Sequence, residues 1–243
     1  MKKITFGSVD EYFFEDKEVH PQPIKQYIPD WFKQMGQRID DAYVGAPNYE
    51  NKNKAKTIKA CPSFVELWDE GFVIPAPCDY ILQWIDGELY WRTRATFNQG
   101  RYDQQEVTNH WNSQMVDGLP KESDARVIVK LNLPYKVFTP KGYSIRQHPY
   151  PYSFIKEWTA LEGVLRSDKI HSVNIQIFLN TDEEVVIRKG DPLCLYIPYK
   201  RELFKADMID LNKDSKISKL YKKHSFQTYS LFKFDMKGYL NED

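Results

Sequence analysis

Four residues beside a proline-rich corner have the chemistry to bind an anionic, ring-bearing ligand. Arg146 and His148 can hold an anion, and Tyr150 and Tyr152 can stack on a planar ring. Tyrosines and prolines of this kind also occur in ordinary surface loops. The segment is therefore a candidate ligand site, with a plain surface loop as the alternative.

Other kinds of chemistry have weaker signals in the sequence. The histidines form no HExxH motif and show no close metal-ligand spacing, so no metal site is predicted. The cysteines, Cys61, Cys78 and Cys194, are odd in number and widely spaced, which favours reduced thiols over a disulfide framework. Dinucleotide, P-loop and Gly-x-Ser-x-Gly motifs are missing, and no cofactor is predicted.

The charge composition argues against two classes of partner. The 34 lysines and arginines balance 34 aspartates and glutamates, so no long-range field attracts nucleic acid or an anionic membrane. No apolar stretch near the N-terminus is long enough for a signal peptide or a membrane span. We therefore expect a cytoplasmic protein that binds neither a membrane nor nucleic acid.

Elements of the first half are expected to be short. Prolines between positions 21 and 29 predict an extended arm that leads into one helical turn capped by Asp30. The polar stretch 36–56 predicts a surface loop. Apolar residues at helical spacing predict a short amphipathic helix within 61–70, which Gly71 can end.

A tight hairpin is the clearest local feature of the sequence. Asp86-Gly87 separates two apolar runs, and this dipeptide favours the positive φ angles of a type I′ turn. The polar residues 98–124 are expected to form a loop with a short helix.

The pattern becomes strand-like from Arg126. Alternating apolar residues predict a strand that begins there and ends at Pro134. Alternation predicts a half-buried strand at 172–179, and apolar runs at 185–187 and 193–197 predict two more, joined by a turn at 188–191.

Four short motifs in this half resemble the dUTPase/dCTP deaminase family. They are a Pro-x-Gly-Tyr turn at 140–143, Gly-Val-Leu-Arg at 163–166, a strand ending in Asn180, and a Lys-Gly-Asp turn at 189–191. Such turns join strands in many β proteins, so the series of four in the family's order carries the resemblance. It implies a mainly β fold, a distorted β-barrel or jelly-roll of the dUTPase type with a few short helices.

The residues that carry the family's catalysis differ here. The family uses the aspartate of Gly-Val-Ile-Asp to hold or activate water, and Arg166 occupies that position, where a cation cannot accept a proton. Lys169 replaces the aromatic residue that packs on the nucleotide sugar. Asp168 reaches the catalytic position only if the alignment shifts by two residues. The resemblance thus implies no catalytic residue, and the candidate ligand-binding residues are Arg146, His148, Arg166 and Asp168.

Segments of the first half are similar to an uncharacterised domain-of-unknown-function family of marine tailed phages and bacteria. The similar segments are 27–33, 57–64 and 71–79. Together the two resemblances imply three parts: residues 1–125 as an arm, short helix and hairpin packed on the barrel, 126–201 as a dUTPase-like core, and 202–243 as a basic tail with a short helix.

The resemblances imply two functions. The first is a non-enzymatic structural or interaction protein, phage-related, located in the host cytoplasm or the virion. It would assemble through aromatic surface as a homo-oligomer or with viral structural partners. The alternative is a nucleotide-binding or nucleotide-hydrolysing enzyme of the dUTPase/dCTP deaminase type, with the small-molecule nucleotide near Arg146, His148 and Arg166.

Overall fold

Two compact units make up the chain, Met1–Arg201 and Glu202–Asp243. The computed structural model describes residues 2–44, 53–94, 105–210 and 216–219. In the second unit, residues 202–210 have no regular secondary structure and residues 216–219 are helical. The rest of the expected basic tail lies outside the described residues.

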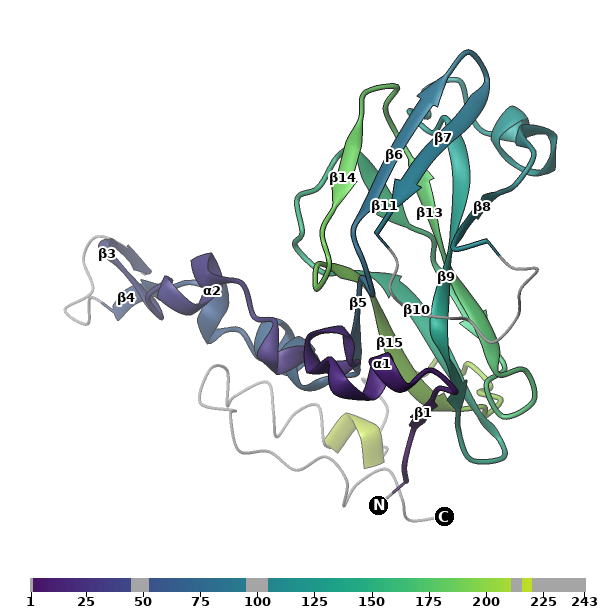
Figure 1. Ribbon diagram of the computed structural model, residues 1–243. Helices are drawn as coiled ribbons and strands as arrows, with labels where there is room; N and C mark the ends of the chain where they lie inside the picture. Colours follow the sequence, from purple (N-terminus) through teal and green to yellow (C-terminus); the bar gives the residue numbers. More distant parts are fainter. Residues whose placement is uncertain (1, 45–52, 95–104, 211–215, 220–243) are drawn as a thin grey trace. The chain divides into compact units, whose positions relative to one another are not determined.

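The first unit is mainly β, as the strand patterns predicted. Every strand pairing among the described residues is antiparallel. Of the expected distorted β-barrel or jelly-roll, a closed barrel is not found, because the described strands of this unit divide into separate sheets (Figure 1). Consecutive strands repeatedly pair with different sheets, so no single sheet closes on itself.

The first sheet is built around the long strand β9. Its order is β1-β9-β13-β11, and β8 also pairs with β9. The strands are β1 (Thr5–Gly7), β8 (Val107–Asn109), β9 (Val127–Phe138), β11 (Trp158–Ala160) and β13 (Ser172–Leu179). Pro134 does not end β9 as expected. Proline lacks an N–H, and Pro134 falls where the register with β13 shifts between Ser172 and Asn174.

The second sheet has β15 at its centre, in the order β12-β10-β15-β5-β2. Its strands are β2 (Gln22–Pro23), β5 (Phe72–Pro75), β10 (Tyr143–Pro149), β12 (Gly163–Leu165) and β15 (Pro192–Lys200). Both faces of β15 are buried along Leu193–Tyr196. Cys194 and Tyr196 belong to the main core cluster, whereas Leu195 belongs to a second cluster with Trp68 and Tyr150. Burial on both faces explains the continuous apolar run of β15.

The third sheet contains the predicted hairpin. Its order is β14-β6-β7, with β6 at Tyr80–Ile85, β7 at Glu88–Thr93 and β14 at Val185–Ile187. Asp86 and Gly87 have φ angles of 51° and 86°, which confirms the tight turn with two positive φ values. The predicted turn at 188–191 is also confirmed, since the Arg188 and Asp191 backbones hydrogen-bond and Gly190 has a positive φ.

Short helices and one further ladder complete the first unit. The helices are α1 (Glu11–Glu15), α2 (Asp30–Gln34) and α3 (Pro62–Glu66), with single 3-10 turns between the strands. Asp30 is the first helical residue and not the cap, which is Pro29. The surface loop expected at 36–56 is wrong in part, because β3 (Arg38–Val44) pairs with β4 (Asn53–Lys56). In 98–124, residues 98–104 lie outside the described residues, and β8 and two 3-10 turns follow.

One main cluster of buried apolar side chains joins the three larger sheets. Alternation along β13 places Ile175, Ile177 and Leu179 in this cluster with no exposed surface, as the pattern predicted. Ile145 of β10 and Leu82 of β6 belong to the same cluster. The opposite face of β13 carries Ser172, Asn174 and Gln176, and these residues line the candidate site.

Candidate functional site

A pocket of about 300 Å³ lies between β12 and the first half of β13. The two strands follow one another in sequence, yet they pair away from each other. β12 pairs with β10, and β13 pairs with β9 along its length and with β11 only at residues 177–179. At one end the Leu161 N–H donates to the Gln176 carbonyl at 2.8 Å and closes the gap. The facing edges of the two strands therefore border the pocket without pairing to each other.

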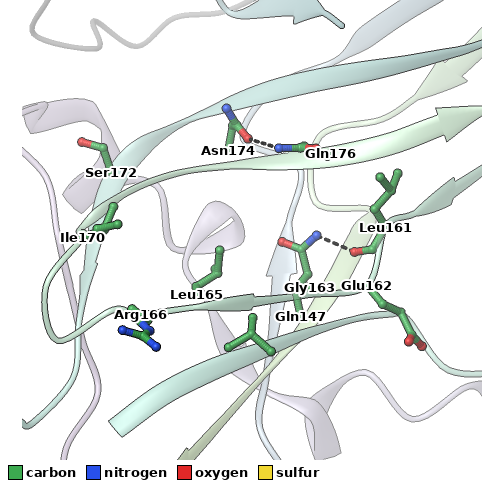
Figure 2. Close-up of a pocket in the computed structure, with 11 residues that line it drawn as sticks. Gln147, Leu161, Glu162, Gly163, Leu165, Arg166, Ile170, Ser172, Asn174 and Gln176 are labelled. Atoms are coloured by element: carbon green, nitrogen blue, oxygen red, sulfur yellow. Dashed lines mark hydrogen bonds between the residues drawn. The ribbon is translucent and has the colours of Figure 1, made fainter. Parts of the chain in front are cut away.

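Three amide side chains are among the polar groups that line the pocket. Gln147 of β10 is buried, and its Nε2 donates to the Leu161 carbonyl oxygen at 2.7 Å. Asn174 and Gln176 project from β13 on the opposite side, as Figure 2 shows, with Gln176 Nε2 3.4 Å from Asn174 Oδ1. Each amide group offers both a donor and an acceptor. The lining can thus hydrogen-bond to a ligand whose edge carries both donors and acceptors.

Arg166 and Ile170 line the pocket at its other end. They belong to the loop between β12 and β13, where the Arg166 carbonyl oxygen accepts the N–H groups of Lys169 and Ile170 at 2.9 Å each. The Arg166 side chain is exposed. A guanidinium at a pocket mouth suits an anionic group, which it can hold through paired hydrogen bonds.

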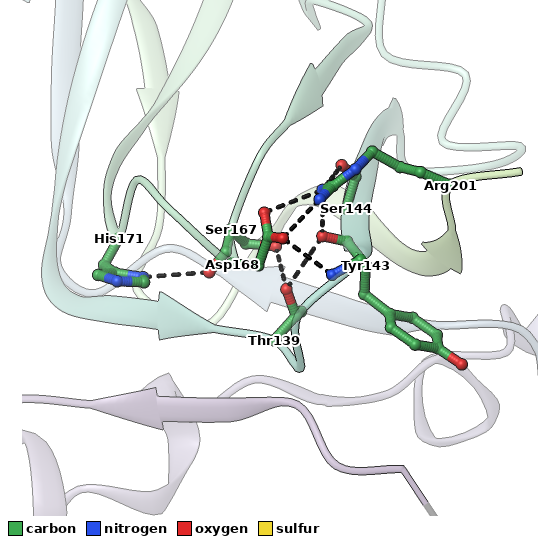
Figure 3. A network of polar contacts seen from close by, with 8 residues as sticks. Thr139, Tyr143, Ser144, Ser167, Asp168, His171 and Arg201 are labelled. Carbon is green, nitrogen blue, oxygen red and sulfur yellow. Dashed lines mark hydrogen bonds and ion pairs between the residues drawn. The ribbon is translucent and has the colours of Figure 1, made fainter.

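Asp168 lies in the same loop but points away from the pocket. Its carboxylate accepts two hydrogen bonds from Arg201, Nη1 to Oδ1 at 2.9 Å and Nη2 to Oδ2 at 2.5 Å, and a third from the Gly142 N–H at 2.9 Å (Figure 3). The Arg201 guanidinium and the Gly142 N–H together hold the pKa of this carboxyl well below its usual range. Asp168 therefore stays ionised and is fully engaged in structure.

A second set of hydrogen bonds anchors the same loop to β9. The Thr139 and Ser167 hydroxyls hydrogen-bond at 2.8 Å. His171 Nδ1 lies 3.2 Å from the Val137 carbonyl oxygen and 3.1 Å from that of Ser167, so this nitrogen must carry the proton and donate. The His171 ring stacks on Phe138 with 4.3 Å between centroids. The pocket wall that carries Arg166 is thus held at both ends.

The structure does not bring the four candidate ligand residues together. Of them, only Arg166 lines the pocket. Arg146 is exposed on β10 with its guanidinium 5.3 Å from the centre of the Tyr199 ring, and His148 pairs with Glu162 at 3.2 Å. Because side chains alternate along a strand, Gln147 faces the pocket while its two neighbours face away. Asp168 is bound to Arg201.

The tyrosines of the candidate segment also have structural partners. The Tyr150 hydroxyl donates to the Tyr27 carbonyl oxygen, and the ring packs in the second core cluster. Tyr152 contacts the rings of Trp31, Phe64 and Trp68. Sequence reasoning missed the pocket amides Gln147, Asn174 and Gln176. The polar face of the strand at 172–179 was the available signal for two of them.

In the part of the chain that the structure describes, no group of three or more histidine, cysteine, aspartate or glutamate side chains is arranged to hold a metal ion. None of its helices is long and apolar enough to cross a membrane. The three cysteines are free thiols, and burial raises the pKa of Cys78 and Cys194.

No protein-family model matches the chain, and a comparison with curated proteins finds no match. An assignment of function therefore depends on the chemistry of the site. The candidate site considered for that chemistry is the pocket bordered by two strand edges, three amide side chains and one guanidinium.

Proposed function

We propose that the protein is a non-enzymatic binding protein, and that the pocket between β12 and β13 holds a nucleobase or nucleotide. The observation that carries this proposal is the pair of facing strand edges. Backbone N–H and C=O groups alternate along such an edge, and each needs a hydrogen-bonding partner. A planar base has donors and acceptors along its own edge, so it suits a gap between two strands.

The side chains of the pocket support the same ligand class. Asn174 and Gln176 add amide donors and acceptors on one wall, and Leu165 and Ile170 add apolar contact. Arg166 supplies a positive charge at the mouth, where a phosphate or another anionic group would lie. The four motifs that resemble the dUTPase/dCTP deaminase family favour a nucleotide within this class, and a dUTPase-like fold is part of the proposal.

A binding role without chemistry is favoured by the carboxylates near the pocket. Hydrolysis or deamination would need a base within reach of water. Among the described lining residues Glu162 alone is acidic, and its Oε1 already lies 3.2 Å from His148 Nδ1. Asp168, the other candidate base, is ionised and bonded to Arg201 and Gly142.

Thermal unfolding and calorimetry with a panel of ligands test the proposal. Each canonical nucleoside and deoxynucleoside is compared with its mono- and triphosphate. We expect one base to raise the unfolding midpoint, because a ligand that binds only the folded state stabilises it. The recovered nucleotide should be unchanged by mass. Failure of the whole panel to shift the midpoint would remove the nucleotide proposal, and a hydrolysed or deaminated product would replace binding with catalysis.

An assembly role is a second candidate, supported by an aromatic cluster that reaches the surface at Trp31 and Phe154. The cluster consists of Trp31, Phe32, Phe64, Trp68, Tyr152 and Phe154. Tyr152 and Phe154 both have a φ of 56°, which bulky residues seldom adopt, and Phe154 is 73% exposed. Backbone strain that presents an aromatic ring to solvent suggests a partner. We propose a second copy of the chain, in a phage-related protein of the host cytoplasm or virion.

Light scattering at micromolar concentration tests the assembly role. A stable oligomer is expected for the natural chain, and the double substitution W31A/F154A should shift it toward monomer. Trp111, which is 78% exposed outside the cluster, gives the matched control W111A. A monomeric natural chain would contradict this role and leave the nucleotide proposal intact.

A further inference from the structure

A second pocket, of about 370 Å³, lies where the N-terminal strand meets the turn between β9 and β10. β1 pairs with the end of β9, where Thr5 lies opposite Phe138, and the chain then turns through 139–142 into β10. Pro198 of β15 and Phe72 of β5 form the opposite side. This pocket shares no lining residue with the pocket between β12 and β13.

The walls of this second pocket are apolar and aromatic. Ile4, Phe6, Phe72, Tyr143 and Pro198 are each only half-buried, so their apolar surface faces the open space. The Phe6 and Phe72 rings make an edge contact with 6.1 Å between centroids, which fixes one wall. Exposed apolar surface in a concave site is unfavourable in water, and its burial by a ligand is a source of affinity.

Two lysines lie at the rim of this apolar pocket. Lys2 and Lys3 are both exposed, and Lys2 Nζ lies 5.5 Å from the centre of the Tyr143 ring. In the described part of the chain neither ammonium group forms an ion pair with a carboxylate, whereas Arg201 and Lys189 do. The rim thus has uncompensated positive charge next to an apolar interior.

We propose that this pocket binds a free amphipathic carboxylate, with its apolar body between Phe6, Phe72 and Pro198 and its carboxylate between Lys2 and Lys3. The apolar interior favours a ligand with a large apolar body, and the two ammonium groups favour one with an anionic head. A neutral molecule of the same shape would contact only the apolar interior. Inorganic phosphate would contact only the two lysines.

Calorimetric titration of the full chain with straight-chain carboxylates tests this site. From butanoate to octanoate the affinity should rise about fourfold with each added methylene, because each one buries further apolar surface. Octanoate should bind more tightly than 1-octanol. The double substitution K2Q/K3Q should weaken octanoate about tenfold, since two partly exposed charge pairs are lost, and should leave 1-octanol unchanged.

A matched control variant distinguishes the loss of the two lysines at the rim from a general loss of positive charge. K121Q/K141Q removes two exposed lysines that do not line the pocket, and it should leave octanoate affinity unchanged. The proposal is overturned if octanoate shows no saturable binding, if 1-octanol or phosphate binds equally well, or if the two double variants lose affinity to the same extent. None of these outcomes depends on nucleotide binding.

Discussion

The Asp168 carboxylate and the Arg201 guanidinium form a two-armed ion pair that joins the loop after β12 to the end of β15. The same arginine donates to the Tyr143 carbonyl oxygen at 2.6 Å and to the Ser144 hydroxyl at 2.8 Å. The aspartate side chain is 3% exposed. Asp168 is therefore a positioning residue for the loop that carries Arg166 to the pocket.

Asp168→Asn is expected to lower stability in a pH-dependent way. The folded carboxyl has a lowered pKa, so in the acid range the unfolded chain binds a proton that the folded chain does not. Its contribution is present at neutral pH and is lost as the pH falls toward the folded pKa. Urea unfolding between about pH 5 and 2 should show a shallower loss of stability in the variant than in the natural chain.

Asp182→Asn is the control for this measurement. Asp182 pairs with Arg126 at 3.1 Å, but its side chain is 63% exposed, and surface pairs contribute little. Its unfolding curves should follow those of the natural chain at each pH. If the two variants behave alike, the Asp168–Arg201 pair does not hold the loop.

Arg166→Gln should discriminate between nucleosides and nucleotides. The side chain lies at the pocket mouth and not between the strand edges, so it is expected to contact phosphate and not the base. Loss of a hydrogen bond to a charged group corresponds to about a 10- to 100-fold lower affinity for the nucleotide. Calorimetry should show unchanged nucleoside affinity. Arg188→Gln, an exposed arginine elsewhere, serves as the control.

Substitution by alanine should lower the free energy of unfolding by very different amounts at two glycines with similar backbone angles. Gly87 has a φ of 86° and no atom within 4 Å of an added Cβ. Gly87→Ala should therefore cost only the strain of a left-handed backbone conformation at alanine, about 1–2 kcal/mol. At Gly71, with a φ of 90°, the added Cβ would lie 2.5 Å from the Tyr196 carbonyl oxygen. Overpacking should add about 1–3 kcal/mol there. Equal unfolding free energies would contradict the close approach of Gly71 to β15.

Buried tyrosine hydroxyls divide into bonded and unbonded groups. The Tyr150 hydroxyl donates to the Tyr27 carbonyl oxygen, and Tyr150→Phe should cost about 1 kcal/mol in urea unfolding. The Tyr135 hydroxyl is buried with no partner among the described residues, so Tyr135→Phe should be neutral or stabilising. A loss of more than about 1 kcal/mol in Tyr135→Phe would indicate a bound water at this hydroxyl.

Tyr150 should also affect stability at alkaline pH. Burial raises its pKa to about 12 from an ordinary value of 10.0. Between these values the folded chain keeps a proton that the unfolded chain loses, so stability falls as the pH rises. The fall should be smaller in Tyr150→Phe. An unchanged slope in that variant would contradict the raised pKa.

Local patterns identified the elements whose geometry depends on neighbours in sequence. Asp86-Gly87 forms the tight turn because both residues adopt positive φ angles. Alternation at Ile175, Ile177 and Leu179 predicted the buried face of β13, because side chains alternate along any strand. These features require no knowledge of which distant segments pair.

Pairing between distant segments could not be predicted from local sequence patterns. β12 and β13 are separated by one loop and pair with strands of different sheets, and the pocket lies between them. Gln147 faces that pocket only because β10 pairs with β12 in the observed register. β3 and β4 were missed because their charged residues lack apolar alternation, although any backbone can pair.

The position of β15 also has a consequence for synthesis on the ribosome. β15 is the middle strand of its sheet, hydrogen-bonded to β10 on one edge and to β5 on the other. Until about residue 200 has emerged, these two partners have no common neighbour, and each presents a bare edge to other nascent chains. Completion of this sheet therefore waits until β15 has been synthesised, and chains released before that point should be especially prone to aggregate.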